Sequence, residues 1–443
     1  MQTPSPAVAT LARRVPLIYH CPMWPALANR LKRLLLPLLV LLAFTAAAAP
    51  EWPRFEEERH RLNALVAVRE FDFLSWLWGA VSSKGEAAAV AGQDYLEAGA
   101  QQGLVLDYLA HVAEARRLQR EIERVYADPA VADPGAAAAP LQQTLAATRA
   151  RMAELQPVAE AIVQEQVAAV LAAEGFGLLG AIFPPVQMHM TPLPLVLIVS
   201  PREEIKQLYN VPLQHGLPVA VQEELEDAVW EELDRSALVV PIGGLGLYPA
   251  MIVETGNLTF LADVVAHEWA HHWLTLQPVG MRYAASSEMR TINETVASIV
   301  GAEVGALVVA RFYPHLAPPP AAESEAPEAP PEPPTFDFRA EMAETRRQVD
   351  ALLAADEVEA AEAYMEERRT LFVEHGYQIR KLNQAYFAFY GAYADTPGAT
   401  GDDPVGPAVV ALREQSASLH DFLRRVAPVT SFEQLQEEVR AAP

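Results

Sequence analysis

A chain of 443 residues with 57 acidic and 33 basic side chains has a formal net charge of −24, which argues against nucleic acid and anionic membrane surfaces as partners. Hydrophobic residues make up 51% of the chain, enough for a large core and two or three subdomains. The single cysteine, Cys21, excludes an intramolecular disulfide framework. We therefore expect a soluble acidic protein, and the composition leaves its oligomeric state open.

The N-terminus has the order of segments that is typical of a secretory signal. Three basic residues between positions 30 and 33 precede an apolar run at 34–44, and small residues follow as far as Ala49. The run contains Pro37 and is shorter than the roughly 20 residues of a spanning helix. We expect export to the periplasm or the extracellular space, with residues 1–49 as a signal peptide or a single N-terminal membrane anchor.

Residues 50–190 are expected to form a helical N-terminal region. Apolar residues recur every three or four positions over 54–78, 87–126 and 141–173, which predicts amphipathic helices that pack on one another. The Ala- and Pro-rich stretch 128–140 is expected to be a loop. For the aromatic cluster of Phe71, Phe73, Trp76 and Trp78 we expect core packing, and a membrane-facing or ligand-facing patch is the alternative.

A small sheet is expected in the next part of the chain. Residues 195–200 predict a buried strand, Pro201 predicts the first turn of a helix, and residues 221–234 predict a further helix. The apolar runs 237–242 and 248–254 flank a glycine-rich turn at 243–246, which predicts a β-hairpin. No Gly-Lys-Ser/Thr sequence follows these glycines, so we discount a phosphate-binding loop.

The most specific motif is His267-Glu268-Trp269-Ala270-His271, an HExxH sequence inside an apolar stretch (257–277) that predicts one helix. Residues four apart lie on one face of a helix, so His267 and His271 can bind one metal ion while Glu268 points at water held there. The motif predicts a hydrolytic site with one Zn²⁺ ion. The alternative is a helix whose two histidines are ordinary polar residues.

A catalytic zinc ion also needs a third protein ligand and an open position for water. After a polar loop at 280–290, residues 291–312 predict a second apolar helix, on which Glu294 shares a face with small residues that include Gly301 and Gly305. Small side chains would let the two helices approach, so Glu294 is the expected third ligand, with Glu288 and Glu303 as alternatives. Glu294 could instead close a capping box with Thr291, and the glycines could serve close packing alone.

The sequence HEWAHH followed by INETVAS resembles the gluzincin branch of zinc metallopeptidases over about residues 238–312. The resemblance implies a zincin-like core at 191–316, with zinc ligands His267, His271 and Glu294 and with Glu268 as general base. It also implies a small sheet whose edge strand pairs with extended peptide substrate. The 22 residues between His271 and Glu294, and the missing G-x-M-E-N sequence, match no particular subfamily.

The rest of the chain divides at a Pro-, Ala- and Glu-rich tract, 317–335, which we expect to be a disordered loop. Beyond it, residues 336–443 predict a helical C-terminal region in which Tyr386, Tyr390 and Tyr393 recur at helical spacing. Because gluzincins use a Tyr or His from such a region to stabilise the oxyanion, the resemblance implies Tyr386, Tyr390 or His420 for this role. Ordinary core packing is the alternative.

Taken as a whole, the sequence predicts a mainly α fold with a small β-sheet (α+β) and a zinc metallopeptidase acting on a peptide or protein substrate outside the cytoplasm. Zinc would lower the pKa of its water and polarise the scissile carbonyl, and Glu268 would transfer the proton. The alternatives are a zinc amidase with a non-peptide or cell-wall substrate, and an exported helical binding or scaffold protein with a non-catalytic zinc site. An intact Glu268 disfavours the scaffold, because a structural zinc normally has four protein ligands.

Overall fold

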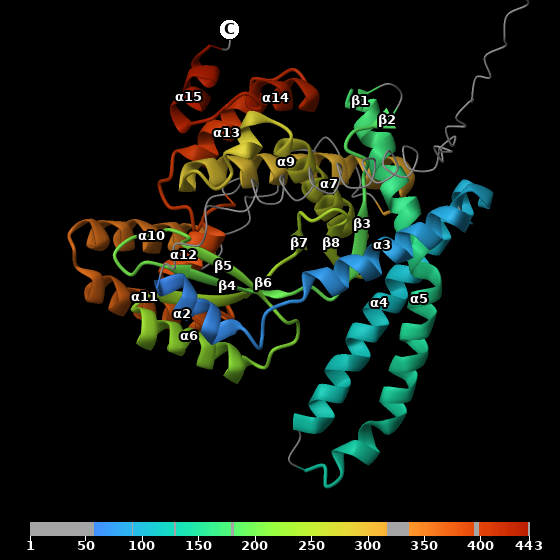
Figure 1. Cartoon of the computed structure of the whole chain (residues 1–443), viewed down its shortest axis with the longest axis horizontal. Coiled ribbons are helices and arrows are strands. Elements are labelled where there is room, and N and C mark those ends of the chain that lie inside the picture. Colours follow the sequence, from blue (N-terminus) through green and yellow to red (C-terminus); the bar gives the residue numbers. More distant parts are fainter. Residues whose placement is uncertain are drawn as a thin grey trace, which may run out of the picture. The chain divides into compact units, whose positions relative to one another are not determined.

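The computed structural model describes residues 57–90, 92–127, 130–178, 181–316, 336–393 and 398–441. The chain divides into two compact units, Met1–His60 and Arg61–Pro443, and the second holds every element below except the start of α2. Helices dominate the described residues and the strands form small sheets, which confirms the mainly helical fold (Figure 1). The predicted signal or anchor (1–49) and the Pro-, Ala- and Glu-rich tract (317–335) lie outside the described residues.

The N-terminal region is helical, but its boundaries differ from the predicted ones. It contains α2 (Glu57–Val66), α3 (Phe73–Val90), a short 3-10 helix (Gly92–Tyr95), α4 (Ala98–Ala127) and α5 (Pro134–Ala173). The single helix predicted over 54–78 is wrong, because Asp72 accepts hydrogen bonds from the backbone of Leu74 and Ser75 and so starts a new helix, α3. The helix predicted over 87–126 is also divided, because residues 87–90 end α3 and α4 begins only at Ala98.

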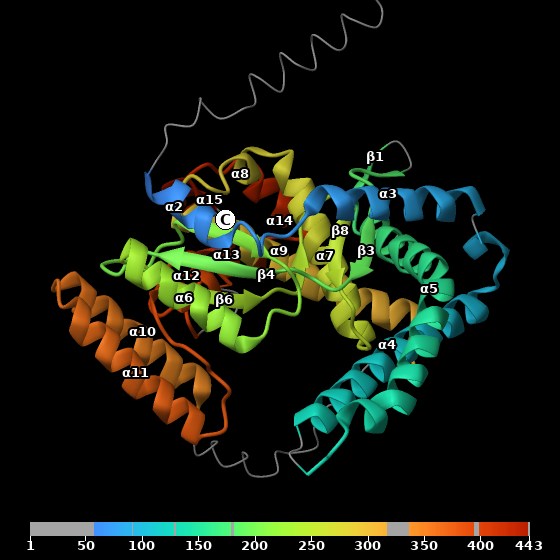
Figure 2. The same ribbon diagram turned by 60° about the horizontal axis from the view of Figure 1, so that its bottom comes forward.

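The loop predicted over 128–140 is also shorter than expected. Asp133 caps α5 by accepting a hydrogen bond from the backbone N–H of Ala136, and Pro134 lies in the first turn, where proline is well tolerated. The alanines that follow are therefore helical rather than part of a loop. α4 and α5 pack along each other as a long antiparallel pair, which both views show (Figures 1 and 2).

One three-stranded sheet is built around β4 (Leu195–Ser200), with β5 (Tyr209–Leu213) and β6 (Ser236–Pro241) antiparallel on either side. Side chains of α2 and α6 (Val219–Leu233) cover one face, and α12 (Gln384–Tyr390) covers the other. The strand at 195–200 and the helix at 221–234 are confirmed. The helix predicted from Pro201 is wrong, because residues 201–208 connect two paired strands, and this pairing overrides the local preference of proline.

A second sheet lies next to the helix that carries the HExxH motif. In it, β8 (Ala250–Val253) pairs parallel with β3 (Met188–Thr191) and antiparallel with β7 (Gly244–Leu245), which is an edge strand. The hairpin predicted from 237–242 and 248–254 is therefore wrong: the two runs belong to different sheets. The β8 strand pairs instead with two residues of the glycine-rich segment. A separate two-stranded sheet is formed by β1 (Gly177–Leu178) and β2 (Ala181–Ile182).

The largest hydrophobic core surrounds α7 (Leu258–Thr275) and α9 (Ser287–Phe312), which the short α8 (Pro278–Met281) connects. Side chains of α4, α5, β3, β8 and the C-terminal helices complete it, so all three predicted regions contribute. By length and composition α9 could cross a membrane, but half of its apolar stretch is buried inside the protein. We interpret α9 as a core helix. The C-terminal helices are α13 (Val405–Glu414), α14 (Leu419–Val426) and α15 (Phe432–Arg440).

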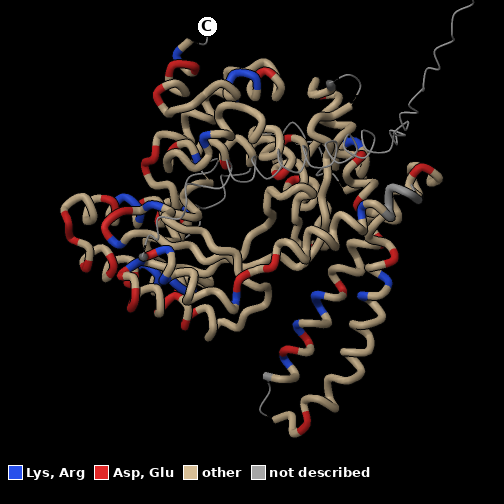
Figure 3. Tube along the Cα trace, viewed as in Figure 1, with Lys and Arg blue, Asp and Glu red and all other residues tan. Residues whose placement is uncertain are grey.

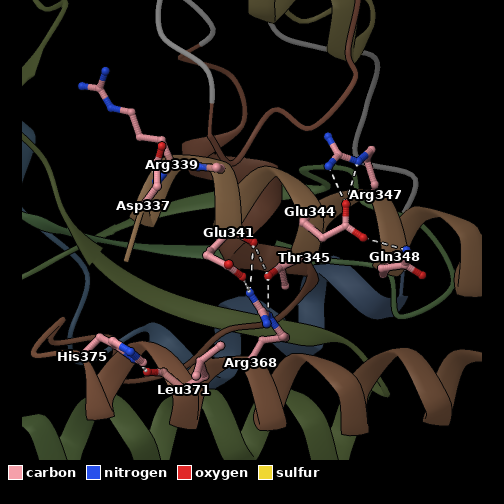
Figure 4. Close-up of polar contacts among 11 residues, drawn as sticks. Asp337, Arg339, Glu341, Glu344, Thr345, Arg347, Gln348, Arg368, Leu371 and His375 are labelled. Atoms are coloured by element: carbon pink, nitrogen blue, oxygen red, sulfur yellow. Dashed lines mark hydrogen bonds and ion pairs between the residues drawn. The ribbon is translucent and has the colours of Figure 1, made fainter. Parts of the chain in front are cut away.

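A helical pair, α10 (Phe338–Ala354) and α11 (Val358–Glu374), has its own apolar core and many charged residues along its trace (Figure 3). Figure 4 shows Arg368 of α11 directed at Glu341 and Thr345 of α10. The Arg368 Nε donates to the Thr345 hydroxyl at 2.9 Å. The helical C-terminal region predicted over 336–443 is thus confirmed in part, since residues 375–383 break the helical pattern before α12.

Two glycines let α7 and α9 approach closely. A Cβ atom on Gly301 would lie 2.3 Å from Asp263 Oδ1 and 3.1 Å from His267 Cβ, and one on Gly305 would lie 2.8 Å from the backbone N of Asp263. The small-residue face predicted on this helix therefore meets the turn of α7 that carries the first histidine. Its effect is to bring two helix backbones into contact beside the HExxH motif.

We predict that Gly305→Ala destabilises the protein, because the new methyl group would meet backbone atoms that cannot move unless the helices separate. Overpacking of this kind costs about 1–3 kcal/mol. Gly103→Ala on α4 is the matched control: nothing lies within 4 Å of its added Cβ, so we expect a gain of about 0.5–1 kcal/mol from helix propensity. Urea unfolding monitored by circular dichroism measures both, and equal effects would contradict the close approach.

Candidate metal centre

The helix predicted over 257–277 is present as α7, and it presents both histidines of the HExxH motif on one face. Asn257 caps it, with its side-chain oxygen accepting a hydrogen bond from Phe260 N at 3.1 Å. Trp269 and Ala270 are buried in the main core, so the helix cannot rotate without exposing them. His267 and His271 are one turn apart, and their Nε2 atoms lie 3.1 Å from each other.

Glu294 lies well inside α9, which begins four residues before the predicted start at 291. Ser286 caps the helix by accepting a hydrogen bond from Met289 N, so the alternative capping box with Thr291 is wrong. The neighbouring Asn293 donates to the carbonyl oxygens of Val279 and Met289. The bond to Val279 ties the first turns of α9 to α8, next to the residue that faces α7.

The three side chains have the separations that a tetrahedral metal ion needs. Glu294 Oε2 lies 3.7 Å from His267 Nε2 and 3.5 Å from His271 Nε2, and ligand atoms of all three residues lie within 4.8 Å of one another. With metal–ligand bonds of about 2.0–2.2 Å, the edge of a coordination tetrahedron is about 3.3–3.6 Å. The donor set of two imidazoles and one carboxylate therefore fits zinc.

The alternative third ligands are engaged elsewhere. Glu303 forms a two-point ion pair with Arg413 of α13, at 2.7 and 2.8 Å. Glu288 is exposed in the first turn of α9, where Ser286 lowers the pKa of its carboxyl by hydrogen bonding. Neither residue joins the group formed by His267, His271 and Glu294.

Tyr283 is a site residue that sequence reasoning missed. It lies between α8 and α9, and its hydroxyl donates a hydrogen bond to Glu294 Oε1, which leaves Oε2 directed at the two imidazoles. Burial, followed by the charge of Glu294, raises the pKa of this hydroxyl, so Tyr283 stays a donor at neutral pH. Partners of this kind orient metal ligands and tune their affinity. A tyrosine in a polar loop gives no sequence signal for such a role.

Glu268 lies beside these ligands but does not belong to the group. Its side chain is buried with 5% exposure, and its Oε2 atom has no hydrogen-bond partner among the described residues. Burial raises the pKa of Glu268 to about 7, with Glu294 adding to the rise and His267 opposing it. On its other side the carboxyl packs against β7, where a Cβ on Gly244 would lie only 2.1 Å from Glu268 Oε1.

A cavity of about 420 Å³ opens beside His267 and Glu268. Its walls come from α7, α9, β6 and the segment around α12. The apolar and aromatic side chains that line it are Phe260, Val264, Phe389, Tyr390 and Tyr393. Tyr393 follows α12 rather than lying on it, and its ring centroid is 6.5 Å from that of His267. Burial, and then the charge of Glu294, raises the pKa of Tyr393.

Of the predicted oxyanion residues, only Tyr390 lines this cavity. Tyr386 packs against Tyr390, with ring centroids 4.6 Å apart, and lies outside the cavity lining. His420 contacts Phe176 from α14, at a centroid distance of 5.2 Å, and it is not among the residues around the metal centre either. Tyr393 lines the cavity together with Tyr390, and helical spacing alone offers no reason to prefer it over Tyr386 or Tyr390.

His272, next to the second histidine, serves a different purpose. Its Nε2 donates a hydrogen bond to the carbonyl oxygen of Leu247 at 2.6 Å, and its ring packs edge-on against Tyr248. Burial lowers the pKa of His272, so the ring is neutral at pH 7. The residue thus links α7 to the segment between β7 and β8 and is not part of the metal-binding group.

No protein-family model, curated protein or solved structure matches the chain significantly. Assignment of a function therefore depends on the residues and geometry of the site.

Proposed function

We propose that the chain is a zinc-dependent metallopeptidase, built on a zincin-like core of the gluzincin type, that hydrolyses peptide bonds outside the cytoplasm. One observation carries the proposal: a two-histidine, one-carboxylate group lies next to a buried carboxylate, one oxygen of which has no hydrogen-bond partner in the described part of the chain. Three protein ligands leave one coordination position for water or substrate, whereas a structural zinc is normally closed by four. The unpartnered oxygen of Glu268 is what a general base at that position requires.

Each residue then has a defined task. A bound zinc ion would polarise the scissile carbonyl and lower the pKa of the attacking water. Glu268 accepts the proton of that water and delivers it to the leaving amine. A tyrosine hydroxyl from Tyr390 or Tyr393 is the candidate donor to the oxyanion, because both line the cavity beside His267.

The edge strand β7 is the candidate surface for substrate. Among the described strands it has a partner on one side only, β8, so its other side can add an extended peptide through backbone hydrogen bonds. Gly244 of this strand touches Glu268, so a peptide paired there would run past the general base. This arrangement favours a peptide over a compact small molecule as substrate.

We predict that Gly244→Ala lowers peptidase activity while zinc stays bound. The added methyl group would overlap Glu268 Oε1, and the three atoms nearest to it all belong to Glu268. The flexible carboxyl would therefore move away while the metal ligands keep their positions. Misplacement of a catalytic group by about 1 Å can cost up to a hundredfold in rate. Gly243→Ala is the matched control, because its added Cβ would meet only Phe260 Cζ at 3.5 Å. Equal rates for the two variants would contradict this position for Glu268.

The proposal is tested by metal analysis of the purified protein together with digestion of a peptide library. We expect about one zinc ion per chain, cleavage of a subset of peptides, and loss of cleavage after chelation with recovery on adding zinc. Bound zinc with cleavage of acylated cell-wall fragments but not peptides would replace the peptidase with an amidase. Bound zinc without hydrolysis of either substrate would favour a binding or scaffold protein.

Export is the second part of the proposal, and it depends on the sequence alone. The basic, apolar and small-residue order of positions 30–49 is typical of a signal peptide or anchor. Cell fractionation and N-terminal sequencing test it. We expect the protein outside the cytoplasm, beginning near Ala49 or still carrying the apolar run, and a cytoplasmic protein with an intact N-terminus would contradict it.

A further inference from the structure

One face of α3 is apolar and exposed. Leu74, Leu77, Trp78 and Val81 lie one helical turn apart, and their exposures are 81%, 37%, 77% and 50%. We call these four residues the α3 face. Core packing of the aromatic cluster was predicted, and for Trp78 this is wrong. The side chains of Phe71, Phe73 and Trp76 are partly buried.

The orientation of α3 is fixed by its opposite side. Ala80 is buried, and the Trp76 ring lies 6.1 Å from that of His189 on β3. One turn further on, Lys84 forms an ion pair with Glu160 of α5, which is itself buried. Turning the helix to hide Trp78 would break this buried ion pair, so the α3 face stays directed outward.

The chemistry of the α3 face fits a neutral apolar environment. Residues 73–83 contain no charged side chain, although the chain as a whole carries 57 acidic and 33 basic residues, and Figure 3 shows this stretch of the trace in tan. A protein partner of either charge would find nothing complementary there. A tryptophan among aliphatic residues on one helix face is instead typical of the membrane interface. Soluble proteins seldom expose contiguous apolar side chains without a function for them.

We propose that the α3 face inserts into the interfacial layer of a lipid bilayer with zwitterionic headgroups. The sequence supplies a reason for a bilayer nearby: the apolar run at 34–44 is separated from α2 by residues 45–56, which are 12 residues. Even fully extended, 12 residues span about 40 Å. An N-terminus that stays in the membrane therefore holds α2, and α3 six residues after it, within reach of the same bilayer. The proposal rests on a retained N-terminal anchor, not on the zinc chemistry.

The α3 face is tested with spin labels at two matched valines in the full chain, after Cys21→Ser removes the single native cysteine. Val81→Cys places a nitroxide on the α3 face, and Val373→Cys places one on α11, where the valine is 45% exposed, close to the 50% of Val81. Accessibility to oxygen and to a water-soluble nickel chelate is then measured with and without phosphatidylcholine vesicles. Far-UV circular dichroism of both labelled proteins checks that the fold is kept.

We expect vesicles to raise oxygen accessibility severalfold at position 81 and to lower its nickel accessibility, while position 373 stays in water. A protein that floats with vesicles but keeps the label at 81 in water would overturn the proposal, because the N-terminus would then bind alone. A label at 81 that is shielded before vesicles are added would overturn it too, since another segment would cover the face. Concentration-dependent spin–spin broadening at 81 without vesicles would instead show contact with a second copy.

Discussion

Replacing any one of His267, His271 and Glu294 is expected to remove most of the zinc from the protein. An open site has three protein ligands, so His267→Ala, His271→Ala and Glu294→Gln each leave two, and the imidazoles lie only 3.1 Å apart with no other donor in the group. Loss of an outer-shell partner alone costs roughly 10- to 100-fold in metal affinity, and loss of a ligand should cost more. Metal content after dialysis against a weak chelator measures the effect.

Two controls separate ligand loss from general damage to the helices. Glu303→Gln is on the same helix as Glu294 but breaks an ion pair with Arg413, so it should keep its zinc. His272→Gln adjoins His271 and can still donate to the Leu247 carbonyl, so it should keep its zinc as well. Full zinc content in Glu294→Gln would contradict the assignment of Glu294 as third ligand. If Glu303→Gln lost as much zinc as the ligand variants, the loss would come from damage to folding rather than from a missing ligand.

The parts of this site that could be predicted from sequence are those set by helical periodicity. His267 and His271 share a face because four residues make about one turn, whatever the rest of the chain does. The small residues of α9 likewise predicted a close approach of two helices, and Gly301 and Gly305 do contact the turn of α7 at Asp263. Where the helical repeat alone decides which side chains share a face, their positions can be predicted without knowing the rest of the fold.

The parts that could not be predicted depend on which segments pair in space. The runs 237–242 and 248–254 have the pattern of a hairpin, yet each joins a different sheet, because β4 and β3 are the partners that tertiary packing provides. The contact of Gly244 with Glu268 follows from that pairing and has no local signal. The hydrogen bond from Tyr283 to Glu294 likewise depends on how a loop folds back on α9, which no local sequence pattern indicates. The outward Trp78 shows that aromatic composition does not reveal which side of a helix is covered.

Glu268→Gln is expected to keep zinc and fold but to lose hydrolysis by at least about a hundredfold, the scale of positioned general-base catalysis. The amide has nearly the shape of the carboxyl, so it fits the space between Gly244 and the ligands, and it does not disturb the three side chains that hold the metal. It cannot accept the proton of the attacking water, however. The rate kcat/KM on a peptide found in the library digest and the zinc content are measured on the same preparation.

The comparison with Gly244→Ala makes this test sharper, because both changes act on one carboxyl in different ways. Gly244→Ala displaces a base that can still accept a proton, so its rate should fall less than that of Glu268→Gln and should respond to the bulk of the residue at 244. Glu268→Gln removes the proton acceptor, so no neighbouring substitution should restore activity. Full activity in Glu268→Gln on a substrate that the wild type cleaves would mean that another group activates the water. The buried oxygen of Glu268 would then need a different explanation, as a structural carboxyl that β7 shields from solvent.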